Sequence, residues 1–188
     1  MEYEQKNFDG LLGTEGFSDI LLQNHFKLYA GYVANTNKTI GLMKTLQPGT
    51  LEYAEVRRRF GWEFNGMRLH EQYFGNLVKG GKAFNPDSDF AKLLAEQFGS
   101  FEAWEKDFKS VGSFRGIGWV ILAYDAEANK LFNVWINEHD VGHLAGAKPL
   151  LVLDVFEHAF ITDYGLKKAD YITAFFKAIN WETVVQRM

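Results

Sequence analysis

Two long helical patterns joined by a short turn constrain the fold of this chain more than any other feature. Residues 16–43 contain no proline and carry apolar side chains at a helix-like spacing behind the start signal at Ser18. The turn at residues 46–50 ends in Thr50, which is suited to cap a second helix, and apolar side chains then recur at helical spacing as far as Leu77. The two helices should therefore run antiparallel, as a hairpin.

The patterns that follow the hairpin are shorter. Residues 88–98 and 100–111 predict two helices, because Gly99 can end the first and Ser100 can cap the second. Helical spacing returns at residues 168–188.

Three apolar runs in the second half predict a sheet. Residues 116–125 and 130–136 are rich in β-forming side chains and flank a short polar link, which predicts an antiparallel hairpin. Residues 149–154 can add a third strand. Helices followed by a mixed sheet indicate an α+β fold. We expect an N-terminal helical hairpin domain at residues 1–82 and a C-terminal α/β domain at residues 83–188.

Composition narrows the possible functions. The chain has no cysteine, so a metal site must use histidine, aspartate or glutamate. The formal net charge of -4 at pH 7 provides no basic surface, and we expect no nucleic-acid partner. The sequence has no uninterrupted apolar window of about 18 residues and no basic start followed by an apolar stretch, so we expect no membrane association and a cytoplasmic location.

Four side chains combine into a candidate metal site. His25 and His70 fall on opposite arms of the predicted hairpin, where their imidazoles can face each other. The alternative is two buried histidines that bond only to protein groups. Asp154 closes an apolar strand and His158 follows four residues later, which presents one carboxylate oxygen and one imidazole nitrogen. The alternative for Asp154 is a helix cap that forms an Asp-x-x-Glu box with Glu157.

Residues 149–159, which include Asp-Val-Phe-Glu-His, closely resemble the Asp-Val-Trp-Glu-His signature of iron/manganese superoxide dismutases. Three further segments resemble other landmarks of that family in the same order, at residues 98–102, 116–119 and 170–181. The resemblance covers residues 17–188. It implies an N-terminal helical hairpin followed by an α/β half with a three-stranded antiparallel sheet, in agreement with the patterns above.

The resemblance also implies a metal and an activity. Its metal would be one iron or manganese ion per subunit, and its ligands would be His25, His70, Asp154 and His158. The implied activity is the dismutation of superoxide to oxygen and hydrogen peroxide. The alternatives are a dismutase-like metal-binding protein with weak or no turnover, a zinc site for hydrolysis, and a helical interaction module whose histidines bind no metal.

The resemblance implies that a further residue tunes the reduction potential of the metal. His139 lies 20 residues after Trp119, where manganese-type relatives place a glutamine that hydrogen-bonds the solvent beside the metal. Glu138 is the competing candidate, and His143 is interpreted as a loop histidine. Iron-type relatives supply the glutamine from the position of Gly66, which leaves room here for a group from the other half. This resembles the manganese or metal-promiscuous arrangement.

The first helix departs from the family pattern. Relatives place a tyrosine eight residues after the first ligand, whereas Tyr29 and Tyr32 follow His25 at four and seven residues. Both positions share a helix face with His25, and loss of a π-type bulge could absorb the missing residue. We interpret Tyr32 as a catalytic gateway that relays protons, with Tyr29 as a helper. The alternative is two core tyrosines.

The resemblance finally implies a homodimer in which Glu157 reaches the partner's ligand histidine. In relatives, a histidine near the gateway tyrosine pairs with a tyrosine of the other subunit. Here those positions hold Tyr29 or Leu28, and Phe160 or Ile161. We therefore expect the proton relay between subunits to be altered.

Overall fold

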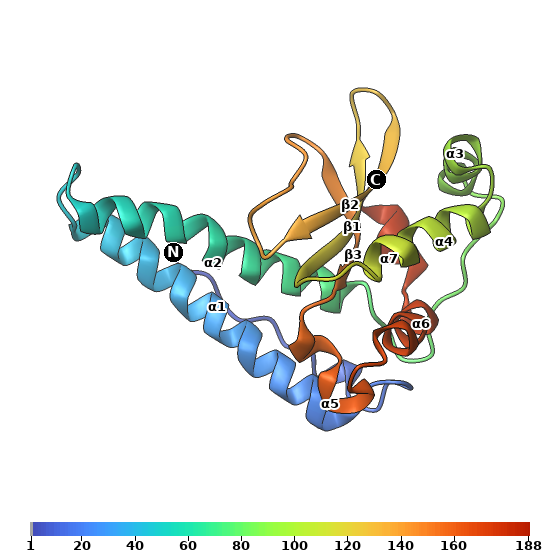
Figure 1. The fold of residues 1–188 in the computed structure, drawn as a ribbon, viewed down its shortest axis with the longest axis horizontal. Helices are drawn as coiled ribbons and strands as arrows, with labels where there is room; N and C mark the ends of the chain where they lie inside the picture. The colour runs from blue at the N-terminus through green and yellow to red at the C-terminus, as the bar shows by residue number, and fades with distance from the viewer. Residues whose placement is uncertain (1) are drawn as a thin grey trace.

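The first half of the protein is a long antiparallel helical hairpin (Figure 1). The computed structural model describes residues 2–188, in which α1 spans Asp19–Thr45 and α2 spans Leu51–Gly75. Both helices begin as predicted, because the hydroxyls of Ser18 and Thr50 each accept a hydrogen bond from the backbone N–H three residues later. No helix within the described residues is long and apolar enough to cross a membrane.

Two shorter helices open the second half. They are α3 (Asp89–Phe98) and α4 (Phe101–Gly112), and the hydroxyls of Ser88 and Ser100 cap their first turns. Gly99 ends α3 with a φ of 89°, a left-handed conformation that glycine adopts without steric cost. The two predicted helices are therefore confirmed.

A three-stranded antiparallel sheet follows, with the strand order β2-β1-β3. Its strands are β1 (Gly118–Asp125), β2 (Lys130–Asn137) and β3 (Lys148–Asp154). The register pairs Trp119 of β1 with Asp154 at the end of β3. The predicted α+β class is confirmed, and this pairing brings a tryptophan next to the aspartate of the candidate site.

The C-terminal region forms several short elements instead of one helical segment. They are the 3-10 turn η2 (Glu157–Ala159) and the helices α5 (Ile161–Tyr164), α6 (Lys168–Ala178) and α7 (Trp181–Gln186). The break between α6 and α7 arises because the backbone there pairs with the loop after α2. Ile179 O accepts from Lys82 N at 2.8 Å, and Asn180 N donates to Asn76 O at 2.6 Å.

β3 lies beside the C-terminal part of α2 (Figure 1), and buried polar contacts join the two halves there. Asn76, which caps the end of α2, donates from Nδ2 to Val152 O at 2.6 Å. The Tyr171 hydroxyl of α6 donates to Asp154 O at 2.7 Å and lies 3.0 Å from the Tyr73 hydroxyl of α2. These contacts hold the end of β3 against α2 and α6.

Candidate metal centre

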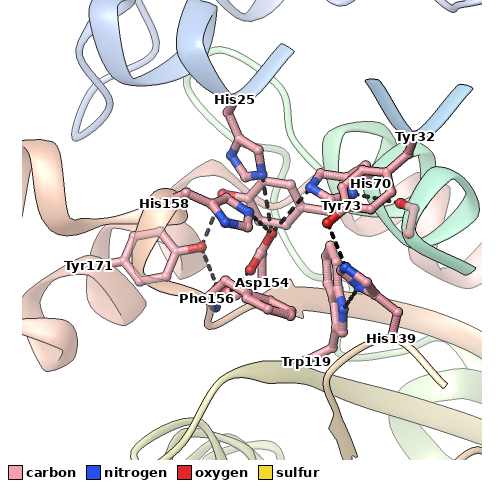
Figure 2. A network of polar contacts seen from close by, with 11 residues as sticks. His25, Tyr32, His70, Tyr73, Trp119, His139, Asp154, Phe156, His158 and Tyr171 are labelled. Atoms are coloured by element: carbon pink, nitrogen blue, oxygen red, sulfur yellow. Dashed lines mark hydrogen bonds and ion pairs between the residues drawn. The ribbon is translucent and has the colours of Figure 1, made fainter. Parts of the chain in front are cut away.

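The four predicted ligands meet at one point, although they come from four separate elements (Figure 2). His25 lies on α1, His70 on α2, Asp154 at the end of β3 and His158 in η2. One ligand atom from each lies within 4.8 Å of all the others. Asp154 Oδ2 is 3.1 Å from Nε2 of His25, 3.1 Å from Nε2 of His158 and 3.7 Å from Nε2 of His70. Three imidazole nitrogens and one carboxylate oxygen therefore face one small space.

Asp154 is held so that Oδ2 is directed at the histidines. Its Oδ1 accepts a hydrogen bond from Phe156 N at 2.8 Å, and its backbone oxygen accepts the bond from Tyr171. The next element starts only at Glu157 and has no side-chain cap. Asp154 is thus not the helix cap that its spacing from Glu157 also allowed.

Hydrogen bonding determines which nitrogen of His70 is available. Nδ1 lies 2.6 Å from the carbonyl oxygen of Gly66, which can only accept, so Nδ1 carries the proton. Nε2 then presents a lone pair, and within residues 2–188 it has no hydrogen-bond partner although the ring is fully buried. A buried unsatisfied acceptor costs about 1–3 kcal/mol, and a bound metal ion would satisfy it.

The charges of the site also favour a cation. Burial lowers the pKa of His25 and lowers that of His70 further, so both rings are neutral at neutral pH. Burial alone would raise the pKa of Asp154, but the charge and hydrogen bond of His158 and the hydrogen bond of His25 hold it well below its usual range. An ionised, fully buried carboxylate beside the neutral imidazoles of His25 and His70 is costly unless a positive charge compensates it.

The donor set agrees with this electrostatic argument. Three imidazole nitrogens and one carboxylate oxygen, without a thiolate, suit iron and manganese and, by donor type alone, zinc. The hydrogen-bonding argument leads to the same result, because no group in residues 2–188 satisfies His70 Nε2. The residues present therefore fit a mononuclear transition-metal ion.

Tyr32 and His139 form a hydrogen-bonded pair beside the cluster (Figure 2). The Tyr32 hydroxyl is 2.7 Å from His139 Nε2, and Trp119 Nε1 donates to His139 Nδ1 at 3.0 Å. Because the indole can only donate, His139 Nδ1 is unprotonated and Nε2 carries the proton that is donated to Tyr32. Burial lowers the pKa of His139 to about 4, which keeps this neutral tautomer at physiological pH. Glu138, the competing candidate, is exposed and bonds to Trp62 instead.

The ring of Tyr32 occupies the space beside Gly66. A Cβ atom at Gly66 would lie 2.5 Å from Tyr32 Cδ1 and 2.6 Å from Cε1. The same ring stacks on His70 with 5.1 Å between centroids. The room left by the missing side chain is thus taken by Tyr32, and His139 from the second half reaches the Tyr32 hydroxyl.

Tyr29 has a different environment from Tyr32. Its ring is fully buried, and its hydroxyl accepts from Lys6 N and donates to Glu71 Oε1, each at 3.1 Å. Glu71 in turn pairs with Arg68 at 2.7 Å. Both hydrogen-bonding functions of the Tyr29 hydroxyl are therefore used away from the metal cluster.

Sequence reasoning missed two residues that support the site. Tyr171, which bonds to the backbone of Asp154, lies in the segment 170–181 that carries the family resemblance, so this segment was the available signal. Trp62 packs against His139 with 4.4 Å between ring centroids. No motif in the sequence signals that contact.

Comparisons with known proteins agree with the geometry. A family model for the C-terminal domain of iron/manganese superoxide dismutases matches residues 86–187. An iron superoxide dismutase of Aquifex aeolicus is 35% identical over 183 residues, which cover 92% of this chain and 84% of that protein. An iron superoxide dismutase of Cupriavidus metallidurans is 33% identical over 198 aligned positions, which cover 100% of this chain and 96% of that protein.

A manganese superoxide dismutase of Haloferax volcanii is 38% identical over 123 residues, which cover 65% of this chain. The aligned part spans 61% of that protein, less than two thirds of its length. Because the family model matches more than half of the chain and the Aquifex protein aligns with nearly all of it, the chain belongs to the iron/manganese superoxide dismutases, a family of metal-dependent oxidoreductases.

Proposed function

We propose that this protein dismutates superoxide to oxygen and hydrogen peroxide with one iron or manganese ion per subunit, held by His25, His70, Asp154 and His158. The observation that carries the proposal is the buried His70 Nε2, which has no hydrogen-bond partner in residues 2–188 and faces an ionised carboxylate oxygen at 3.7 Å. When bound, the ion supplies the one-electron oxidation of one superoxide and the one-electron reduction of another. Two superoxide anions and two protons thereby give one oxygen molecule and one hydrogen peroxide molecule.

The ligand side chains have distinct tasks in this proposal. The Asp154 carboxylate contributes the negative charge that stabilises the higher oxidation state, and the neutral imidazoles suit the lower one. The bond from His70 Nδ1 to Gly66 O fixes the ring orientation and directs Nε2 inward. Burial of His25, His70 and Asp154 limits the access of water to the redox site.

Tyr32 and His139 are proposed to supply protons. Because His139 donates to the Tyr32 oxygen, the hydrogen of the Tyr32 hydroxyl remains free for a substrate oxygen. Burial, followed by the charge of Asp154, raises the pKa of Tyr32, so the hydroxyl stays protonated at neutral pH. Because Tyr32 and Trp119 engage both ring nitrogens of His139, we propose that its implied role toward the solvent beside the metal is exerted through the Tyr32 hydroxyl.

We also propose a homodimer with Glu157 at its interface. Glu157 is exposed next to His158, whose side chain is 29% exposed. Leu28 and Ile161 are 36% and 46% exposed, whereas Tyr29 is buried. Leu28 and Ile161 are therefore the exposed residues among the positions expected at the subunit contact, and both are apolar. A contact between these two side chains could not transfer protons.

The division into domains remains a proposal as well. The expected boundary between residues 82 and 83 is supported by the family's C-terminal model, whose match begins at residue 86. Contacts across the junction are extensive at β3 and α2, so we propose two structural units that fold together.

Metal analysis and stopped-flow kinetics test the function. Protein loaded separately with iron, manganese and zinc is mixed with superoxide, and the decay is compared with that caused by the same free metal. We expect rapid catalysed decay with iron or manganese, none with zinc, and slower decay for Tyr32→Phe at unchanged metal content. If the protein binds iron or manganese but no loaded form accelerates the decay, the alternative of a metal-binding protein without turnover is correct.

A further inference from the structure

An indole that belongs to neither the ligand set nor the relay covers the bond between His139 and Tyr32. Trp62 lies on α2, and its ring centroid is 4.4 Å from that of His139 and 5.5 Å from that of Tyr32. Trp62 is half-buried, whereas His139 is fully buried. The indole therefore separates the hydrogen-bonded pair from solvent on this side.

Two charged side chains fix the orientation of Trp62. Trp62 Nε1 donates to Glu138 Oε2 at 3.0 Å, across the junction between the two halves. On the ring face, the Arg59 guanidinium carbon lies 3.8 Å from the centroid, a cation–π contact. Arg59 is itself bound to the buried carboxylate of Glu63 at 2.7 Å. The indole is thus held at its edge and on one face.

The backbone of Glu138 explains why this contact affects His139. Glu138 has a φ of 52°, a left-handed conformation that non-glycine residues adopt at a cost in free energy. The turn directs the Glu138 side chain outward to Trp62 and the His139 side chain inward to Tyr32. A bond at Glu138 therefore stabilises the backbone conformation that places His139.

We propose that Trp62 is a positioning residue for His139. By bonding to Glu138 and covering the imidazole, it holds His139 with the Nε2 proton directed at Tyr32 and excludes water from that bond. The placement of His139 is independent of turnover, but its relevance to catalysis rests on the proposed dismutase function.

Nuclear magnetic resonance of the full-length protein tests the inference. The chain is labelled with ¹⁵N-histidine and loaded with zinc, which is diamagnetic and suits the donor set. We expect a single His139 tautomer with a slowly exchanging Nε2 proton in the wild type. Trp62→Phe, which keeps a ring but removes the donor, and Glu138→Ala should each accelerate this exchange at least about fivefold, as expected for loss of one ordinary hydrogen bond.

Matched variants separate positioning from general stability. Glu138→Gln retains an acceptor for the indole and should stay within about twofold of the wild type. Trp135→Phe, at another half-buried tryptophan, and Glu127→Ala, at an exposed turn, should leave His139 unchanged. Should Trp62→Phe not fold, Glu138→Ala at an exposed residue still decides the question.

The result for His139 can be distinguished from the result of the superoxide decay experiment. If the exchange rate of the His139 Nε2 proton and the His139 tautomer are unchanged in both Trp62→Phe and Glu138→Ala, the inference is overturned. Trp62 would then only pack against the surface of the protein. Accelerated exchange in a protein that does not consume superoxide would instead refute the dismutase function and leave the positioning role intact.

Discussion

Substitution of Gly66 by alanine tests whether the ring of Tyr32 is fixed between two helices. The added Cβ would meet Tyr32 Cδ1 at 2.5 Å and Cε1 at 2.6 Å, whereas carbon atoms pack at about 3.5–4.0 Å. The ring must therefore move by about 1 Å. Its neighbours oppose this movement, because His70 stacks on it at 5.1 Å and Trp62 lies 5.5 Å away.

The expected loss of stability follows from these contacts. Overpacking of a filled core costs about 1–3 kcal/mol. A shift of about 1 Å also stretches the 2.7 Å contact between Tyr32 and His139 beyond hydrogen-bond range and leaves a buried N–H unsatisfied, at about 1–3 kcal/mol. With partial relaxation, we expect Gly66→Ala to lower the free energy of unfolding by about 2–4 kcal/mol.

Gly61 provides a matched control on the same helix. Among the residues that the structure describes, none lies within 4 Å of a Cβ atom placed there, so Gly61→Ala should stabilise the protein by about 0.5–1 kcal/mol. Urea unfolding, followed by circular dichroism at fixed metal content, measures both variants. In a Tyr32→Ala background the clash is absent, and Gly66→Ala should then behave like Gly61→Ala. Equal effects of the two alanine substitutions in the wild-type background would refute the reasoning.

Three further changes probe the charges and buried bonds of the protein. Asp154→Asn should weaken iron or manganese binding by more than roughly 100-fold, because loss of a group that only hydrogen-bonds a metal ligand already costs up to that factor. The surface control Asp87→Asn should retain the metal. Metal analysis after dialysis measures both variants. The pKa of His139 is about 4 in the folded protein and 6.5 in the unfolded chain, so between these pH values the unfolded state binds the extra proton. The free energy of unfolding therefore falls as the pH falls from 6.5 to 4. Across this window, urea unfolding should show that the wild type loses up to about 3 kcal/mol more of this free energy than His139→Gln. Arg187→Ala removes a partly buried guanidinium that donates to three acceptors and should cost about 2–4 kcal/mol in urea unfolding, whereas the exposed Arg58→Ala should change stability by less than about 0.5 kcal/mol.

Helix starts could be predicted from the sequence because local chemistry sets them. The hydroxyls of Ser18, Thr50, Ser88 and Ser100 each accept a bond from the backbone N–H three residues later, which depends only on neighbouring residues. The split of the C-terminal segment into α6 and α7 had no such local signal. It results from backbone pairing with residues about a hundred positions earlier in the chain.

Contacts at the site were harder to foresee for the same reason. Which of His139 and Glu138 points toward Tyr32 depends on the left-handed backbone at Glu138, and no residue pattern in the sequence predicts that conformation. The contact of Trp62 with Glu138 joins α2 to the loop after β2. Spacing within either segment gives no information about that contact, because it exists only once the two halves have packed.

The spacing of the first helix shows how a departure from the family pattern can keep the site intact. α1 is an uninterrupted α-helix, and seven residues at about 100° each bring Tyr32 to within about 20° of the face that carries His25. A tyrosine one residue later on an equally regular helix would be turned by a further 100° or so, away from His70. The seven-residue spacing therefore requires a regular helix, and the resulting place of the ring requires the absence of a side chain at Gly66. The missing residue, the regular helix and the glycine are thus three parts of one arrangement.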